Sequence, residues 1–117
     1  MSRELLIAED DPGMAATLRE YLERQGMSVR VTSSADVARQ WLRGGASAIL
    51  DGSIVGQMGI PLGMLPTPRV IIWSGDARLV REAQQLGLRA FCKGNLQDFE
   101  GLLREVASPD FASVPSD

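Results

Sequence analysis

Short apolar segments of strand length alternate along this chain with longer segments in which apolar residues recur at helical spacing. Each short segment has four or five residues that are apolar throughout or alternate with polar ones, a pattern that is typical of β-strands. The expected strands are Leu5–Ala8, Ser28–Thr32, Ala46–Leu50, Val70–Trp73 and Arg89–Lys93. Strands that alternate with helices predict an α/β fold, in which helices cover both faces of a parallel sheet.

Residues that start and stop helices separate these strands. Asp11 followed by Pro12 is a typical helix start, because aspartate caps the first turn and proline fits the first helical position. Gly26 is a suitable residue to end this helix. Further helices are expected from about residue 35 to 44, from 77 to 86, and from the cap at Asn95 to about residue 107.

The segment 52–68 departs from this pattern. It contains four glycines and three prolines, so at most one short or distorted helix fits between the third and fourth strands. After residue 107 the chain is rich in serine, proline and aspartate, which predicts a flexible tail. The sequence therefore predicts one domain at residues 1–107, followed by a C-terminal tail at 108–117.

The composition argues against several classes of protein. A net charge of −3 over 117 residues is typical of one globular domain and disfavours non-specific nucleic-acid binding. One cysteine allows no internal disulfide, and the lack of histidine excludes the usual zinc sites and a phosphohistidine on this chain. No apolar segment has the length of a membrane helix or the character of a signal peptide. We therefore expect a cytoplasmic protein that contacts neither membranes nor nucleic acid directly.

Polar side chains stand at the carboxyl ends of four expected strands. Glu9 and Asp10 follow the first strand, Asp51 the third and Ser74 the fourth, while Lys93 ends the fifth. The carboxyl ends of parallel strands share one edge of the sheet, where open α/β sheets bind ligands. We therefore expect these side chains to meet in one pocket.

Three carboxylates in one pocket, those of Glu9, Asp10 and Asp51, repel one another unless a cation or a proton neutralises them. Oxygen ligands without histidine favour Mg²⁺. A carboxylate beside Mg²⁺ can also attack a phosphorus centre and form an aspartyl phosphate. The transferred phosphoryl group would then be held by the Lys93 ammonium and the Ser74 hydroxyl.

Taken singly, these residues have ordinary structural explanations. Acidic residues interact favourably with the dipole at a helix N-terminus, and Asp-Gly pairs such as Asp51–Gly52 commonly form turns. Cys92, beside Lys93, could be a reactive thiol with a lowered pKa, although a buried strand cysteine is the more common case. The ordered occurrence of all four polar positions at strand ends favours a functional site.

The same residues resemble those of a known family. Over about residues 4–107, the chain is similar to the receiver domains of bacterial two-component response regulators, especially the single-domain, chemotaxis-regulator-like kind. The similarity rests on Leu6–Pro12, Ile49–Asp51, Ile72–Gly75 and Phe91–Lys93, with Gly59 where the family usually has glycine. It implies a flavodoxin-like fold, with a doubly wound, five-stranded parallel sheet of order 2-1-3-4-5 and a third helix that is shortened or irregular.

The resemblance implies roles for the acidic residues. Asp51 would accept a phosphoryl group from the phosphohistidine of a partner histidine kinase or phosphotransfer protein. Mg²⁺ would be bound by Asp10, Asp51 and the Ser53 backbone carbonyl, with Glu9 acting directly or through water. The chain would be a signalling switch, not an enzyme, with output by contact with a downstream protein target.

The resemblance also implies how the phosphoryl group would be held. Lys93 and Ser74 would contact it and report its presence to a distant surface. Gly75 would leave room for its oxygens to approach the backbone, and Gly52 is expected to be a second phosphoryl contact.

Several positions depart from the family pattern and leave alternatives open. Gly94 follows Lys93 where the family has proline, so the usual cis peptide is not expected, and the family's switch aromatic falls on Ala90. The short third-helix region and the missing aromatic motivate a pseudo-receiver, an interaction module that works without phosphorylation. A small α/β enzyme or nucleotide-binding domain is the third possibility. The acidic sequence after the first strand disfavours it, because acids repel phosphate when no metal is bound.

Overall fold

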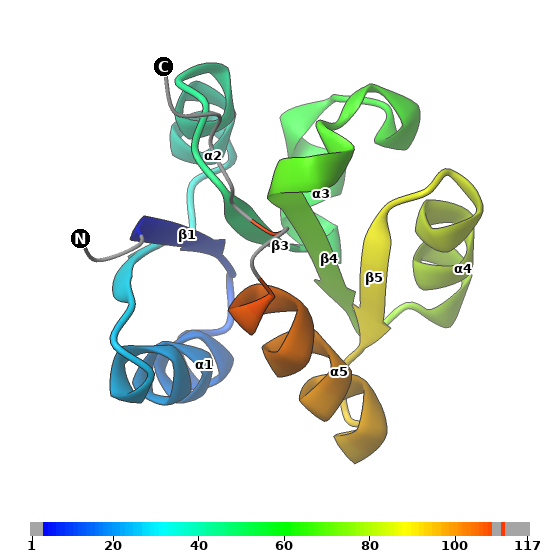
Figure 1. The fold of residues 1–117 in the computed structure, drawn as a ribbon. Helices are drawn as coiled ribbons and strands as arrows, with labels where there is room; N and C mark the ends of the chain where they lie inside the picture. The colour runs from blue at the N-terminus through cyan, green and yellow to red at the C-terminus, as the bar shows by residue number, and fades with distance from the viewer. Residues whose placement is uncertain (1–3, 109–110, 112–117) are drawn as a thin grey trace.

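The computed structural model describes residues 4–108 and 111, in which five strands form one sheet (Figure 1). The strands are β1 (Glu4–Ala8), β2 (Ser28–Thr32), β3 (Ala48–Asp51), β4 (Val70–Ser74) and β5 (Arg89–Cys92). Their order is β2-β1-β3-β4-β5, and each of the four pairings is parallel. The predicted fold class and strand order are therefore confirmed.

Helices cover both faces of the sheet, with α1 and α5 on one face and α2, α3 and α4 on the other (Figure 1). They are α1 (Pro12–Arg24), α2 (Ala35–Arg43), α3 (Gly52–Met58), α4 (Ala77–Gln85) and α5 (Leu96–Ala107). Two short 3₁₀ helices, η1 (Leu62–Met64) and η2 (Thr67–Arg69), connect α3 to β4. Within the described residues, no helix has the length and apolar character needed to cross a membrane.

The third helix is short, as the glycines and prolines of the segment 52–68 predict. Helix α3 has seven residues and ends at Gly59, which adopts a left-handed conformation with φ of 69°. Glycine favours this conformation because it has no Cβ. The helix nevertheless buries Ile54, Val55 and Met58 against the sheet. It therefore covers this face of the sheet together with α2 and α4.

Two apolar clusters form the core, one on each face of the sheet. The α1–α5 cluster lies between the sheet and helices α1 and α5, and the α2–α4 cluster lies between the sheet and helices α2, α3 and α4. Neighbouring strand residues point to opposite faces, so β4 places Ile72 toward α2, α3 and α4, and it places Ile71 and Trp73 toward α1 and α5. In the same way β3 divides Leu50 and Ile49 between the two clusters. Both faces of the central strands are buried, which explains why these strands are apolar throughout.

The segment after α5 contains one core residue. Phe111 is 0% exposed and packs in the α1–α5 cluster, with the guanidinium carbon of Arg89 at 5.8 Å from its ring centroid. The tail expected at 108–117 therefore contacts the domain at this residue. The rest of that expectation, at 109–110 and 112–117, lies outside the described residues.

Candidate functional site

The polar residues at the strand ends are brought to one edge of the sheet. Glu9 and Asp10 follow β1, Asp51 is the last residue of β3 and Ser74 the last of β4, and Lys93 comes directly after β5. Because the strands are parallel and helices start within a few residues of their ends, side chains from distant parts of the sequence are placed side by side. The edge is therefore a candidate site built from four of the five strands.

The Lys93 ammonium lies between two carboxylates. Its Nζ is 2.5 Å from Glu9 Oε1 and 2.6 Å from Asp51 Oδ1. The side chains are 15%, 1% and 7% exposed for Lys93, Glu9 and Asp51 respectively, so all three charges are largely removed from water. Buried charges are tolerated when they are paired. This ion-pair triad is the electrostatic centre of the site.

Burial and pairing act together on the three pKa values. Burial raises the pKa of Glu9 above its ordinary value of 4.5, and the hydrogen bond from Lys93 offsets only part of this rise. Burial also acts to raise the pKa of Asp51, but hydrogen bonds from Lys93 and Ser53 outweigh it and hold the pKa below 3.8. Burial acts to lower the pKa of Lys93, but hydrogen bonds to Asp51 and Glu9 prevail and raise it above 10.5. At neutral pH, Asp51 is therefore ionised and Lys93 is positively charged.

The acidic residues are also close enough to share a metal ion. One oxygen each from Glu9, Asp10 and Asp51 lie within 4.8 Å of one another. The Ser53 hydroxyl is 2.8 Å from Asp10 Oδ2 and also contacts Asp51 Oδ2, so it joins two of the acids. Asp10 is exposed while the other two acids are buried, which opens the cluster to solvent on one side. Carboxylate oxygens of this kind fit a hard divalent cation.

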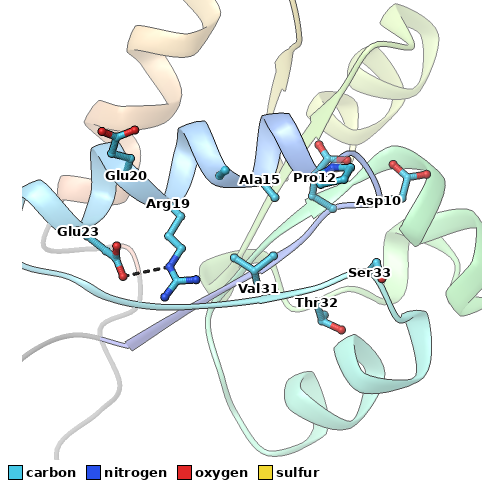
Figure 2. Close-up of a pocket in the computed structure, with 11 residues that line it drawn as sticks. Asp10, Pro12, Ala15, Arg19, Glu20, Glu23, Val31, Thr32 and Ser33 are labelled. Carbon is cyan, nitrogen blue, oxygen red and sulfur yellow. Dashed lines mark hydrogen bonds and ion pairs between the residues drawn. The ribbon is translucent and has the colours of Figure 1, made fainter.

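A pocket adjoins the acidic cluster on the side of β2. Figure 2 shows this pocket between α1 and β2, with Asp10 at one end. The pocket has a volume of about 520 Å³, and Glu9 is also among its lining residues. Val31 of the edge strand β2 lies in it and is exposed. Arg19 and Glu23 of α1 also line the pocket, and Arg19 Nε donates a hydrogen bond to Glu23 Oε2 at 3.1 Å (Figure 2). The pocket therefore gives the acidic cluster an opening toward the β2 edge of the sheet.

Ser74 is buried and occupies the space above Gly52. The Ser74 Oγ accepts a hydrogen bond from the Asp76 backbone N–H at 3.0 Å. A Cβ added at Gly52 would lie 2.4 Å from Ser74 Oγ and 2.7 Å from Leu79 Cδ2. Gly52 therefore has a packing role that depends on β4 and α4 and is not visible in the sequence. An added Cβ at Gly75 would meet nothing within 4 Å, so the backbone there stays open.

Asp98 supports the end of β5 and is not singled out by sequence reasoning. Its Oδ2 accepts a hydrogen bond from the Cys92 backbone N–H at 2.6 Å. Asn95 caps α5 by accepting from the Asp98 N–H, so the available sequence signal is a cap residue followed three positions later by an acid. The Lys93–Gly94 peptide is trans, like every described peptide bond, and Gly94 has φ of 79°. The turn that presents Lys93 is thus held by Asp98 and Gly94.

Cys92 is an ordinary strand cysteine. Burial raises the pKa of its thiol above 9.0, and the nearby Asp98 carboxylate raises it further. At neutral pH the thiol is therefore protonated and weakly nucleophilic. The direction of this shift is opposite to the lowered pKa that a reactive thiol would need.

Comparisons with known proteins agree with this architecture. No model of a known protein family and no curated protein matches the sequence. Among solved structures, NtrX from Brucella abortus matches with a TM-score of 0.67 and 20% identity, over 92% of this chain and 26% of the NtrX chain. A CheY-like receiver domain of a response regulator from Methylobacillus flagellatus matches with a TM-score of 0.61 and 24% identity, over 91% and 99% of the two chains. The BeF3-activated N-terminal receiver domain of RstA from Klebsiella pneumoniae matches with a TM-score of 0.62 and 18% identity, over 87% and 96%. With its strand order and the position of its acidic cluster, this chain has the fold of the response-regulator receiver domains.

Proposed function

We propose that this chain is a signalling switch in which Asp51 accepts a phosphoryl group from a partner protein in a Mg²⁺-dependent step. The observation that carries the proposal is the Lys93 ammonium held at 2.6 Å from Asp51 Oδ1, beside acidic residues that could hold a metal ion. The low pKa of Asp51 keeps its carboxylate ionised and therefore nucleophilic. The receiver-domain fold supports the same role.

The donor of the phosphoryl group is proposed to be a phosphohistidine on a histidine kinase or phosphotransfer protein. This chain has no histidine, so the donor imidazole must come from a partner. An Asp51 oxygen attacks phosphorus, the phosphorus–nitrogen bond breaks, and its electron pair returns to the imidazole. The step consumes the donor and leaves a covalent product on this chain, so the chain is a switch rather than an enzyme.

The other residues of the site stabilise charge during this transfer. Glu9, Asp10 and Asp51 would hold Mg²⁺, which would supply positive charge to offset the negative charge of the phosphoryl group. Lys93 supplies the second positive charge, because its raised pKa keeps the ammonium protonated. Ser74 can donate its hydroxyl hydrogen to a phosphoryl oxygen while still accepting from the Asp76 N–H. The contacts of Gly52 and Gly75 with the phosphoryl group, and of the Ser53 backbone carbonyl with Mg²⁺, remain predictions.

A second candidate function is a phosphorylation-independent interaction module. It is favoured by Ala90, a buried small side chain that packs in the α2–α4 cluster at the position where the family resemblance implies an aromatic residue. The Gln84 side chain donates to the Ala90 carbonyl at 2.9 Å, which ties this part of β5 to α4. In such a module the site would be present but would not accept a phosphoryl group.

Intact mass spectrometry separates the two candidates. After incubation with Mg²⁺ and acetyl phosphate, we expect one phosphoryl group per chain. The adduct should be absent in Asp51→Asn and when Mg²⁺ is chelated, and it should persist in the control Asp36→Asn, which changes a surface aspartate of α2. A wild-type protein that stays unmodified would favour the interaction module. An adduct that survives in Asp51→Asn would exclude Asp51 as the acceptor.

The adjacent acids Asp10 and Asp11 are expected to have different roles. Asp11 caps α1 by accepting from Gly13 and Met14 N–H at 2.9 and 3.2 Å, whereas Asp10 is part of the acidic cluster. Asp11→Ala should therefore lower the free energy of unfolding by about 1 kcal/mol and leave Mg²⁺ affinity unchanged. Asp10→Ala should weaken Mg²⁺ binding. Denaturant unfolding and calorimetric titration check both; equal losses of Mg²⁺ affinity in the two variants would contradict this division.

A further inference from the structure

Trp73 connects the Lys93 ammonium to aromatic side chains on α5 and α1. Lys93 Nζ lies 5.3 Å from the centroid of the Trp73 ring. The Trp73 ring is 6.0 Å from that of Phe99, and Phe99 contacts Tyr21 edge-to-face with centroids 5.4 Å apart. The contacts therefore run without interruption from the centre of the ion-pair triad to Tyr21, which is 44% exposed.

These aromatic side chains line a groove between α1 and α5. The groove has a volume of about 660 Å³, and Met14 and Leu96 also line it. Trp73 is only 4% exposed, and its Nε1 is buried with no hydrogen-bond partner among the described residues. A buried tryptophan N–H usually has a partner that fixes the indole. Here the packing of the ring faces and the adjacent ammonium determine where the indole lies.

The connection lies on one defined face of the sheet. Trp73 and Phe99 pack with the α1–α5 cluster, whereas Ala90 packs with the α2–α4 cluster on the opposite face. Strand β5 (Arg89–Cys92) thus has no aromatic side chain toward α4, since its one aromatic residue, Phe91, packs with the α1–α5 cluster. An aromatic path from the site to the surface is therefore present on the α1–α5 face.

We propose that Trp73 is a positioning residue for Lys93 and transmits the position of the ammonium to the groove between α1 and α5. The proposal rests on the proposed function for the identity of the signal, a phosphoryl group on Asp51. Lys93 cannot remain centred between two carboxylates while it neutralises a phosphoryl group that one of them carries. Its Nζ therefore moves relative to the indole, and a cation–π attraction is significant only within about 6 Å. The indole then repacks against Phe99, and Tyr21 changes its environment.

The sequence supplies one reporter at each end of this path. Lys93 is the only lysine and Tyr21 the only tyrosine, so isotope-labelled lysine and tyrosine each give a single NMR spin system. On addition of Mg²⁺ and beryllofluoride, a phosphoryl mimic, we expect both Lys93 and Tyr21 resonances to shift in the wild-type protein. In Trp73→Leu, Lys93 should still shift while the Tyr21 shift is lost. Trp73→Phe, which keeps a ring face, should restore part of the Tyr21 shift.

Trp41 provides a matched control. It is the other tryptophan, and its Nε1 is also buried with no hydrogen-bond partner in the described part of the chain. Its ring centroid lies 4.8 Å from the guanidinium carbon of Arg30. Trp41→Leu therefore removes a similar side chain and a similar cation contact away from the site, and it should keep the wild-type response of Tyr21. A full Tyr21 shift in Trp73→Leu would overturn the proposal, and so would a Lys93 shift without a Tyr21 shift in the wild-type protein.

Failure of the proposed function has a different signature. If beryllofluoride shifts neither Lys93 nor any other site resonance, the phosphoacceptor role fails. The coupling is then tested without a phosphoryl mimic by Lys93→Arg, which keeps the positive charge but relocates it. We expect this variant to shift Tyr21 in the wild-type background and to leave it unshifted in Trp73→Leu. A Tyr21 resonance that does not respond to Lys93→Arg, or that responds equally in both backgrounds, would overturn the role of Trp73.

Discussion

Lys93→Met is expected to lower the free energy of unfolding by about 3–5 kcal/mol at neutral pH without metal, because it leaves uncompensated buried charge. The ammonium lies 2.5 Å from Glu9 Oε1 and 2.6 Å from Asp51 Oδ1. The Glu9 side chain is 1% exposed, so its carboxylate has little contact with water to offset the lost partner. Methionine keeps an unbranched side chain of similar length, which limits the loss of packing.

The pH dependence of this loss has a definite sign. In the wild-type protein, the stabilisation from Asp51 is present above its ordinary pKa of 3.8 and is lost as the pH falls toward its lower folded value. The stabilisation from Lys93 is present below 10.5 and is lost as the pH rises through its higher folded value. Without Lys93, burial and mutual repulsion raise the pKa values of Glu9 and Asp51. The folded variant then binds more protons than its unfolded chain. Lowering the pH from neutral should therefore reduce the difference in free energy of unfolding between Lys93→Met and the wild-type protein.

Mg²⁺ should also reduce this loss of stability in Lys93→Met. The metal and the Lys93 ammonium compete for the same carboxylates, so in the variant the metal can neutralise the charges that the ammonium no longer pairs. We expect higher Mg²⁺ affinity in the variant than in the wild-type protein. Denaturant unfolding with and without Mg²⁺, at neutral and acidic pH, measures both effects. Arg24→Gln is a suitable control, because Arg24 pairs with Glu20 in a largely exposed ion pair of little expected value. A collapse of Mg²⁺ affinity in Lys93→Met would show that Lys93 supports the metal rather than the phosphoryl group.

Gly52→Ala is expected to lower the free energy of unfolding by about 1–3 kcal/mol through overpacking. An added Cβ would lie 2.4 Å from Ser74 Oγ, and Ser74 is a short, buried side chain with little freedom to move away. Displacement of Ser74 would also break its hydrogen bond with the Asp76 N–H, next to the start of α4. We therefore expect a slower formation of the acetyl phosphate adduct in this variant.

The same helix provides a control for the intrinsic effect of replacing glycine by alanine. A Cβ added at Gly56 would meet nothing within 4 Å, and the residue lies inside α3. Gly56→Ala should therefore raise the free energy of unfolding by about 0.5–1 kcal/mol, as expected for an exposed helical position. Denaturant unfolding of both variants tests the contrast. Two variants with the same change in stability would show that Ser74 and Leu79 adjust freely around position 52.

The sequence by itself determined the fold class, because the apolar periodicity of strands and helices reports which backbone segments are buried on one face or on two. The alternation of elements implies parallel pairing, and the observed order β2-β1-β3-β4-β5 agrees with the family resemblance. Boundaries were less accurate. The third strand spans Ala48–Asp51 rather than 46–50, because Asp51 still pairs in register with Trp73 of β4. A polar residue at a strand end carries no apolar signal of its own.

The tertiary structure decided which side chains actually touch. Lys93 contacts Asp51, which lies 42 residues earlier in the sequence, and Ser53 contacts Asp10, which lies 43 residues earlier. Local sequence patterns carry no information about contacts at such separations. The same holds for the crowding of Gly52 by Ser74, and for the burial of Phe111 beyond the last helix. Such contacts depend on how sheet order, strand register and helix packing combine in space. For that reason the candidate residues could be named from the sequence, whereas the ion-pair triad and the aromatic path beside it could not.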